Sequence, residues 1–278
     1  LDGKYVLQAQ IGSGGYAVVY RAIAMGTQQA VAVKVYRPVS EATKAARQMS
    51  RFRQEEAATH RVSHPNTVAI LDSGTALGGI NYLVMELLKG HPLTTEMQPD
   101  QPLSLARCME VALPLCRVLV EAHGLGVVHR DIKPDNIFLH TDDGGEVVKL
   151  LDFGIANFVD AAVWLRWAHT QTGEIIGTLT YMSPEQLSGS PCDGRSDVYS
   201  LALTVYEMLS GRLPFPSEGL SPMQSLMHRI STSPPLLHTV APHVPKGVSD
   251  VVMGALSSDP TNRPSAAEFL AGLQQATR

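Results

Sequence analysis

The chain of 278 residues exceeds the roughly 100 to 200 residues of an ordinary single domain, so we expect a large core or, preferably, two packed lobes. Hydrophobic residues at 44% and charged residues at 17% argue against long disordered tracts. The net charge of −4 offers no basic surface to nucleic acid, and no apolar run reaches the about 18 residues of a membrane-spanning helix.

The first part of the chain predicts a glycine-rich hairpin. Two β-rich runs, Tyr5 to Ile11 and Ala17 to Ala24, flank the sequence GSGGY at 12–16. This is not the strand-then-helix context of a dinucleotide fingerprint. Glycines that close a hairpin let backbone N–H groups approach a triphosphate. An ordinary flexible hairpin is the alternative that this signal leaves open.

A third strand is predicted at residues 30–35. Its alternation puts the valines at 31, 33 and 35 on one face, and Ala32 and Lys34 on the other. A lone lysine on a strand is usually solvated. Because Lys34 follows a glycine hairpin and has the small Ala32 beside it, we favour a role in binding phosphate.

Residues 41–62 lack Gly and Pro and carry many helix formers, so we expect a helix there. Glu55 and Glu56 would lie about 100° apart on it, and therefore only one can face the strand that carries Lys34. Solvated acids are the alternative for both.

Two further strands are predicted, at residues 67–72 and 80–85, around a Gly78-Gly79 turn. The segment His64-Pro65-Asn66 ends the preceding helix. The strand-rich region should therefore contain five strands.

The pattern becomes helical after Glu86, so we place a lobe boundary at residue 88. The predicted lobes are residues 1–88 and residues 89–278. The backbone of residues 86–88 would line the cleft between them, a setting that suits a flat heteroaromatic ligand.

The segment HRDIKPDN at residues 129–136 carries the strongest chemical signal. Pro134 favours a loop, in which Asp131, Lys133 and Asn136 can converge on one point. Phosphoryl transfer needs an acid to accept a hydroxyl proton, a cation for the phosphate and an oxygen ligand for a metal. These three side chains supply them.

Two elements should support this loop. Apolar residues at helical spacing predict a core helix over 103–124, and residues 137–139 and 147–151 predict a hairpin. Asp152, in the triplet DFG, follows that hairpin and is a candidate magnesium ligand. A surface turn is the alternative, but the hairpin should bring Asp152 close to Asn136.

These motifs resemble those of the eukaryotic-type (Hanks-type) Ser/Thr protein kinases, most closely the bacterial branch. The resemblance runs from Tyr5 to about Leu273 and rests on GSGGYAVV at 12–19, VAVK at 31–34, HRDIKPDN at 129–136, DFG at 152–154 and SPE at 183–185. It implies an α+β bilobal protein-kinase fold. One lobe would be a small antiparallel sheet with one main helix, and the larger lobe would be mainly helical.

Three departures from the family pattern are small residues for small residues. Ala17 replaces the third glycine of the glycine-rich loop, Ser183 replaces an alanine, and Ala202 replaces a glycine. We expect that Ala17 does not block the nucleotide and that Ala202 is harmless.

The resemblance implies a set of residues for phosphoryl transfer. Asp131 would orient and deprotonate the substrate hydroxyl, and Lys133 would steady the γ-phosphate. The implied set is Asp131, Lys34, Glu55, Lys133, Asn136, Asp152 and Thr178, with Glu55 rather than Glu56 paired to Lys34, Thr178 bonded to Asp131 and Lys133, and Asn136 and Asp152 as the magnesium ligands.

The implied cofactors are ATP and Mg²⁺, with Mn²⁺ as an alternative. Adenine would bind the backbone of Glu86 and Leu88, next to Met85 at the gatekeeper position. The implied ATP-binding residues are Ile11, Gly12, Ser13, Gly14, Val19, Ala32, Lys34, Met85, Glu86, Leu88, Phe138 and Leu151.

Four further residues have implied structural or regulatory roles. Glu185 would pair with Arg263, and Asp197 would hold the catalytic-loop backbone. Arg130, next to the catalytic acid, usually accompanies control by phosphorylation, and the acceptors here would be Thr170 and Thr172. Plain polar loop residues are the alternative.

Two features make regulation less certain to follow the family. Asn157 stands where relatives often have a basic residue that helps bind the phosphothreonine, so control could be looser. Trp164 and Trp167 are three residues apart, which fits a helical turn with one aromatic face. They would pack on the helical lobe or serve as an inhibitory plug or dimer contact.

The sequence therefore predicts a protein kinase that transfers the γ-phosphoryl group of ATP to Ser and Thr, including its own activation loop in a transient dimer. A pseudokinase scaffold or nucleotide sensor is one alternative, and a small-molecule kinase is another. The small-molecule class usually lacks the SPE segment and the Gly177-Thr178 turn.

The cysteines and the ends of the chain bear on location. The three cysteines, Cys108, Cys116 and Cys192, lack metal-type spacing and predict reduced thiols in the cytoplasm. No signal peptide is visible, and the start at Leu1 suggests a domain of a longer protein. An inner-membrane anchor of that parent would have to lie outside these residues.

Overall fold

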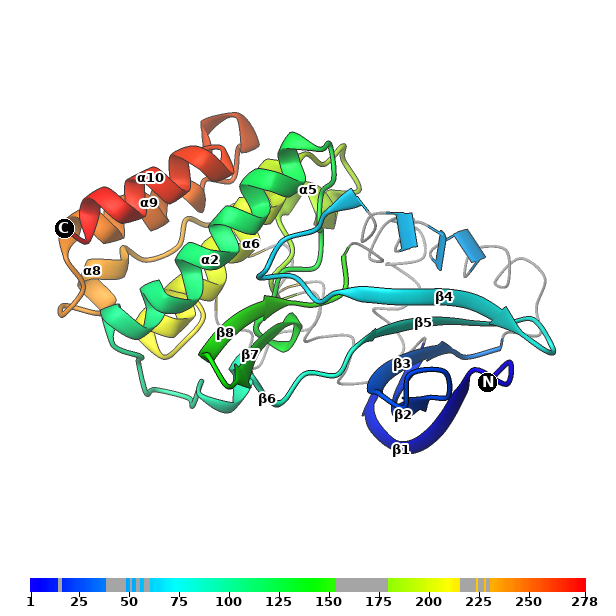
Figure 1. Ribbon diagram of the computed structural model, residues 1–278. Helices are drawn as coiled ribbons and strands as arrows, with labels where there is room; N and C mark the ends of the chain where they lie inside the picture. The colour runs from blue at the N-terminus through cyan, green and yellow to red at the C-terminus, as the bar shows by residue number, and fades with distance from the viewer. Residues whose placement is uncertain are drawn as a thin grey trace.

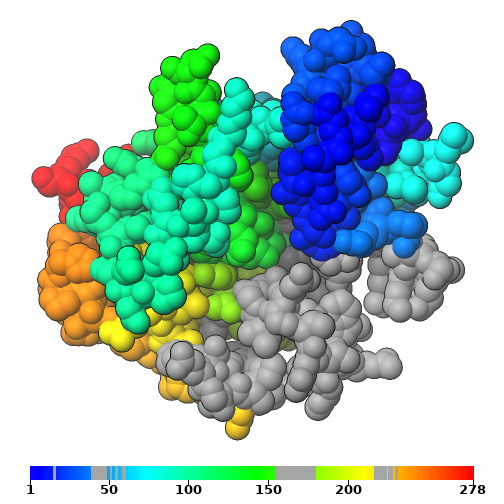
Figure 2. Space-filling view, turned by 90° about the horizontal axis from the view of Figure 1, so that it is seen from below, coloured from blue at the N-terminus to red at the C-terminus, as the bar shows by residue number. Residues whose placement is uncertain are grey.

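The computed structural model describes residues 1–14, 17–38, 49–50, 52–53, 56–57, 61–153, 180–215, 224, 228 and 231–278. A β-rich part and a helical part lie at opposite ends, with a small second sheet between them (Figure 1). Figure 2 shows the first sheet in blue to cyan and the helical part in green to red as two masses side by side. The expected α+β class is confirmed.

The first sheet has five antiparallel strands in the order β1-β2-β3-β5-β4 (Figure 1). The strands are β1 Tyr5–Ser13, β2 Ala17–Ala24, β3 Ala30–Tyr36, β4 Ile70–Ala76 and β5 Ile80–Glu86.

The two faces of β3 differ as the alternation predicted. Val31 and Val33 are buried in one cluster together with Tyr82 and Val84 of β5. Ala32 belongs to another cluster, with Val68 and Met85. Because side chains alternate along a strand, Lys34 shares the face of Ala32.

The bounds predicted for the fourth strand were wrong. Residues 67–72 were expected, but β4 covers Ile70–Ala76. Thr67 instead follows a turn at 65–66 and forms an isolated β-bridge with Leu150, and its N–H and hydroxyl both donate to the carbonyl of His64, at 3.0 and 2.9 Å. The strand continues through Gly74 because a Cβ there would lie 2.5 Å from the hydroxyl of Tyr82, so only glycine admits that ring.

The helix predicted over residues 41–62 is described only in part. All described residues between 49 and 61 are helical. Phe52 from this stretch packs edge-on against Tyr36 of β3, with ring centroids 5.4 Å apart. This contact attaches the helical stretch to the sheet.

The second sheet has the strand order β6-β7-β8, formed by β6 Gly90–Pro92, β7 Ile137–Asp142 and β8 Gly145–Leu150. The β7–β8 hairpin was predicted, and β6 was not. Gly90 has φ +133°, and a Cβ there would lie 2.0 Å from the carbonyl oxygen of Leu139. A glycine is therefore required for β6 to approach β7 this closely.

The helical part packs around α2 Leu105–Gly124 and α6 Gly194–Ser210, whose apolar residues form one buried core (Figure 1). Ser104 caps α2 by accepting from the N–H of Arg107 at 3.1 Å, which begins the helix two residues later than predicted. The other helices are α5 Pro184–Ser188, α8 Leu237–Val240, α9 Lys246–Ala255 and α10 Ala266–Ala276, with short 3₁₀ turns η1 Leu93–Thr95, η2 Pro134–Asn136 and η3 Pro260–Asn262.

Three smaller points concern the sequence predictions. Cys108 and Cys116 are buried in α2 and, like Cys192, are thiols. Among the described helices, none is long and apolar enough to cross a membrane. The lobe boundary at residue 88 stays a prediction, with β5 ending at Glu86 and β6 beginning at Gly90.

Candidate functional site

The backbone of the loop at 129–131 is held by one buried carboxylate. Asp197 of α6 is fully buried and accepts from the N–H of His129 at 2.8 Å and from the N–H of Arg130 at 2.6 Å. The Nε2 atom of His123, at the end of α2, lies 2.8 Å from the same carboxylate. Two helices of the core therefore fix the peptides that precede Asp131.

Two side chains of the loop, those of Asn136 and Lys133, converge on the carboxylate of Asp131. The amide nitrogen of Asn136 donates to both the Oδ2 atom and the backbone carbonyl of Asp131, each at 2.8 Å. The Nζ atom of Lys133 lies 3.2 Å from Oδ2. The side chain of Asp131 is 21% exposed, so a substrate hydroxyl can reach this acid.

The oxygen of the Asn136 side chain is the atom that can serve a metal, because its nitrogen is bonded to Asp131. The backbone carbonyl of Asn136 accepts from the N–H of Leu151 at 2.8 Å, which brings the loop next to Asp152. A carboxamide and a carboxylate oxygen suit a hard divalent cation that is completed by phosphate oxygens. Among the described residues, no three His, Cys, Asp or Glu side chains form a metal cluster.

An ion pair joins the two sheets at this site. The Nζ atom of Lys34 lies 2.8 Å from Oδ1 of Asp152, with side chains 7% and 38% exposed. Burial acts to raise the pKa of Asp152, but Lys34, with His129 and Lys133 nearby, holds it below its ordinary value. Asp152 is therefore ionised at neutral pH, as its predicted role as a metal ligand requires. This contact was not predicted.

Of the two adjacent acids, the structure describes only Glu56. Its carboxylate accepts a hydrogen bond from the hydroxyl of Ser73 in β4. Glu56 is thus engaged with the sheet edge at β4, while Glu55 lies outside the described residues. The pairing of Glu55 with Lys34 stays a prediction.

His129 links the loop to the DFG triplet, which sequence reasoning missed. Its ring is fully buried, with Nδ1 accepting from the N–H of Asp131 at 3.2 Å. Nε2 must then carry the proton, and it donates to the carbonyl of Leu151 at 2.9 Å. The ring of Phe153 lies 4.8 Å away. The histidine two residues before the predicted catalytic acid Asp131 was the sequence signal that could have revealed this link.

Five of the predicted ATP-site residues belong to one apolar cluster between the sheets. They are Val19, Ala32, Met85, Leu88 and Leu151, and the cluster also contains Val68, Ile70 and Leu87, which were not predicted. An apolar cluster with residues from both sheet regions is a suitable surface for binding a flat aromatic ring.

The other predicted ATP-site residues lie around this cluster. Gly12 pairs with Val19 across the β1–β2 hairpin that also holds Ile11, Ser13 and Gly14. The carboxylate of Glu86 accepts from Lys149 at 2.7 Å. Phe138 lies in β7 opposite Lys149, and its contact with a nucleotide stays a prediction.

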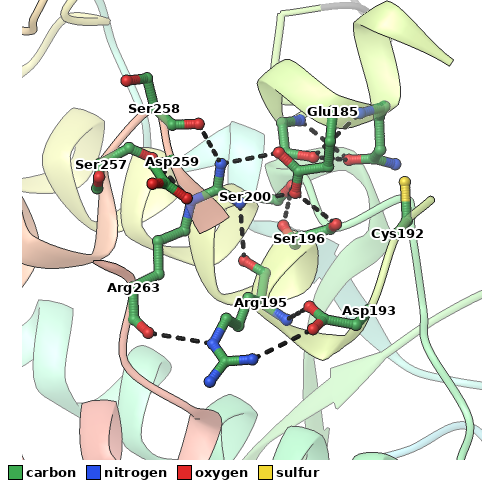
Figure 3. Close-up of polar contacts among 12 residues, drawn as sticks. Glu185, Cys192, Asp193, Arg195, Ser196, Ser200, Ser257, Ser258, Asp259 and Arg263 are labelled. Atoms are coloured by element: carbon green, nitrogen blue, oxygen red, sulfur yellow. Dashed lines mark hydrogen bonds and ion pairs between the residues drawn. The ribbon is translucent and has the colours of Figure 1, made fainter. Parts of the chain in front are cut away.

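Glu185 and Arg263 form a buried, two-pronged ion pair (Figure 3). The distances are 2.6 Å from Nη1 to Oε1 and 2.8 Å from Nη2 to Oε2, and the hydroxyl of Ser196 adds a bond of 2.6 Å to Oε1. Burial acts to raise the pKa of Glu185, but Arg263 and Ser196 lower it below its ordinary value. The pair holds α5 against the helical core.

Arg130 has an unusual backbone and an unusual side chain. Its φ is +67°, and that of Asp152 is +50°, so both residues lie in the left-handed region that costs a non-glycine residue about 1 to 3 kcal/mol. The Nε atom of Arg130 is buried without a hydrogen-bond partner among the described residues. The predicted acceptors Thr170 and Thr172, together with Thr178, Asn157 and the two tryptophans, lie outside the described residues.

Known proteins resemble this chain over almost all of its length. A family model described as the protein kinase domain matches residues 5–272. A probable serine/threonine-protein kinase of Corynebacterium efficiens is 36% identical over 99% of this chain and 41% of its own length. Serine/threonine-protein kinase Pkn1 of Myxococcus xanthus is 38% identical over 99% of this chain and 38% of its own length.

This chain therefore spans less than half the length of these two relatives. In a comparison of structures, the crystal structure of the Mycobacterium tuberculosis PknI kinase domain matches with a TM-score of 0.74 at 24% identity. The match covers 99% of this chain and 97% of that chain, and it supports the fold.

Proposed function

Because this chain belongs to the protein kinase domain family, we propose that it transfers the γ-phosphoryl group of ATP to Ser and Thr hydroxyls of proteins, its own included. The observation that carries the proposal is the convergence of Lys133 and Asn136 on the carboxylate of Asp131. The relatives, which are named serine/threonine kinases, support the choice of acceptor.

In this proposal Asp131 orients the substrate hydroxyl and accepts its proton. Lys133, whose Nζ lies 3.2 Å from Asp131, stabilises the charge on the transferred group. The oxygen of Asn136 and the carboxylate of Asp152 would hold Mg²⁺, which neutralises phosphate charge when bound. Lys34, already next to Asp152, would move its charge to the phosphates of ATP.

The nucleotide would lie against the apolar cluster that contains Ala32 and Met85, with its phosphates under the β1–β2 hairpin. The described positions all carry the reactive residue type, which disfavours a scaffold that has lost catalysis. We also propose that Mg²⁺ rather than Mn²⁺ is the working ion, and that autophosphorylation takes place in a transient dimer.

Arg130 supports a proposal about regulation. A guanidinium with a buried Nε that has no hydrogen-bond partner among the described residues is a receptor for an anion. A phosphate on Thr170 or Thr172 would supply that anion and neutralise the charge next to Asp131.

The test is incubation with radiolabelled ATP and Mg²⁺, comparing the wild type with Asp131→Asn. We expect label on the wild-type protein and a rate about 100- to 10,000-fold lower in the variant. Nucleotide affinity, measured by calorimetry, should stay the same, because Asp131 does not belong to the apolar cluster that contains Ala32 and Met85. Removal of the metal with EDTA should abolish labelling. An unlabelled wild type that still binds ATP would point to a nucleotide sensor instead.

A further inference from the structure

The peptide plane between Arg130 and Asp131 is held at both of its polar ends. Its carbonyl, on Arg130, accepts from the side-chain nitrogen Nε2 of Gln186 at 2.8 Å. Its N–H, on Asp131, donates to Nδ1 of His129 at 3.2 Å. A rotation of this plane would break both bonds and redirect the Asp131 side chain, because the plane is attached directly to its Cα.

This plane needs outside support, since Arg130 has the left-handed φ of +67°. A non-glycine residue persists there only where surrounding contacts hold it. The carboxylate of Asp197 fixes the Arg130 N–H at 2.6 Å, and Gln186 fixes the carbonyl on the other side of the same residue.

The amide of Gln186 is itself oriented by a capping box. Its Oε1 atom accepts from the backbone N–H of Ser183 at 3.0 Å and from the Ser183 hydroxyl at 3.1 Å. With two donors on the oxygen, the nitrogen must point away from Ser183, and it reaches the Arg130 carbonyl. One side chain thus caps α5 and bonds the catalytic loop.

The helix that presents Gln186 is fixed to the core. Glu185 is bonded to the fully buried Arg263, and the hydroxyl of Ser200 donates to the carbonyl of Tyr181 at 2.8 Å, just before α5. The position of the Gln186 Nε2 atom is therefore set by the contacts that anchor α5 and the residues just before it to the helical core.

We propose that Gln186 is a positioning residue for phosphoryl transfer, which holds the Arg130–Asp131 peptide plane and thereby aims the carboxylate of Asp131. The inference rests on the proposed function for its catalytic consequence. The hydrogen bond itself does not depend on that function.

Gln186→Glu separates the two tasks of the side chain. A glutamate keeps an oxygen for Ser183, as Glu268 does for Ser265 in the capping box of α10, and its charge suits a helix N-terminus. It removes the donor to Arg130 and turns a carboxylate oxygen toward that carbonyl. Glu268→Gln, the reverse exchange in the exposed capping box of α10, is the matched control.

We expect kcat of Gln186→Glu to fall about 10- to 100-fold, because the carbonyl of Arg130 loses its hydrogen-bond donor. The KM for ATP should stay unchanged within about twofold. The melting temperature should stay the same. Hydrogen–deuterium exchange should rise in the loop peptide at residues 129–136. Glu268→Gln should change none of these values.

The outcomes separate the two proposals. Unchanged exchange and unchanged kcat in Gln186→Glu would overturn the inference, as would faster exchange with wild-type kcat. Faster exchange in a protein whose wild type transfers no phosphate would refute the function and leave the hydrogen bond supported. If Gln186→Glu does not fold, Gln186→Met, which has a similar length and no amide, should show the same loss of kcat.

Discussion

Arg263→Ala should destabilise the protein strongly, because it leaves the carboxylate of Glu185 buried without its counterion. The side chain of Arg263 is fully buried, that of Glu185 is 7% exposed, and two hydrogen bonds of 2.6 and 2.8 Å join them. Ser196 would keep only one bond to the stranded carboxylate. Breaking a buried pair from one side costs about 3 to 5 kcal/mol.

The assay is urea unfolding followed by circular dichroism at pH 7. A loss of about 3 to 5 kcal/mol in the free energy of unfolding corresponds to a melting temperature about 6 to 20 °C lower for a chain of this size. Lys246→Ala is the control, since its pair with Asp250 is exposed at 72% and 56% and should contribute at most about 0.5 kcal/mol. Replacing both partners, with Glu185→Leu and Arg263→Met, should recover at least half of the loss.

The pH dependence gives a second check. The pKa of Glu185 in the folded wild type is lowered from its ordinary value of 4.5, so its stabilising contribution is present above that pH and is lost as the pH falls through the folded-state pKa. Without Arg263, burial raises this pKa, and protonation relieves the stranded charge. The difference in free energy of unfolding between the variant and the wild type should therefore shrink from pH 7 to pH 4. A difference below about 1 kcal/mol at pH 7, or one that grows on acidification, would refute the reasoning.

Two further predictions concern the site. Lys34→Met should lower the phosphorylation rate roughly 100- to 1,000-fold and, since Lys34 lowers the pKa of Asp152, move the acidic limb of the residual pH–rate profile to higher pH; a limb that stays in place would contradict the pairing. Thr170→Ala with Thr172→Ala should reduce activity toward a substrate peptide several-fold and remove phosphate detected by mass spectrometry. In an Arg130→Ala background the two threonine substitutions should cause no further loss of activity. Full activity of the Thr170→Ala, Thr172→Ala double variant would exclude regulation by phosphorylation at these threonines.

Local physical rules explain why much of the fold could be predicted. Side chains alternate along a strand, so the two faces of β3 followed from its residues alone. The predicted glycine turn at 78–79 is present, and both glycines have positive φ within a three-residue loop that joins the paired residues Ala76 and Ile80. The end of α2 at Gly124 was predicted, whereas its start was predicted two residues too early, before the N-cap residue Ser104.

The core of the site was predictable for a related reason. Asp131, Lys133 and Asn136 lie within six residues on one loop. A loop this short keeps their side chains close together, and they contact one another in the structure. The hairpin between Asn136 and Asp152 has paired strands, which returns the chain close to where it started. Here a local constraint determines a functional arrangement.

The sequence by itself thus determined the strand faces, the hairpins and the convergence of Asp131, Lys133 and Asn136 in one loop, because these depend on neighbours in the chain. The family resemblance also implied Asp197 on the N–H groups of that loop, and the structure places it there. Only the tertiary structure decided that Gln186 bonds the carbonyl of Arg130 and that Lys34 pairs with Asp152. It also decided the bounds of β4 and the existence of β6, where Gly74 and Gly90 admit a ring and a carbonyl. Such contacts depend on how separate elements pack, and no periodicity or spacing in the chain encodes that packing directly.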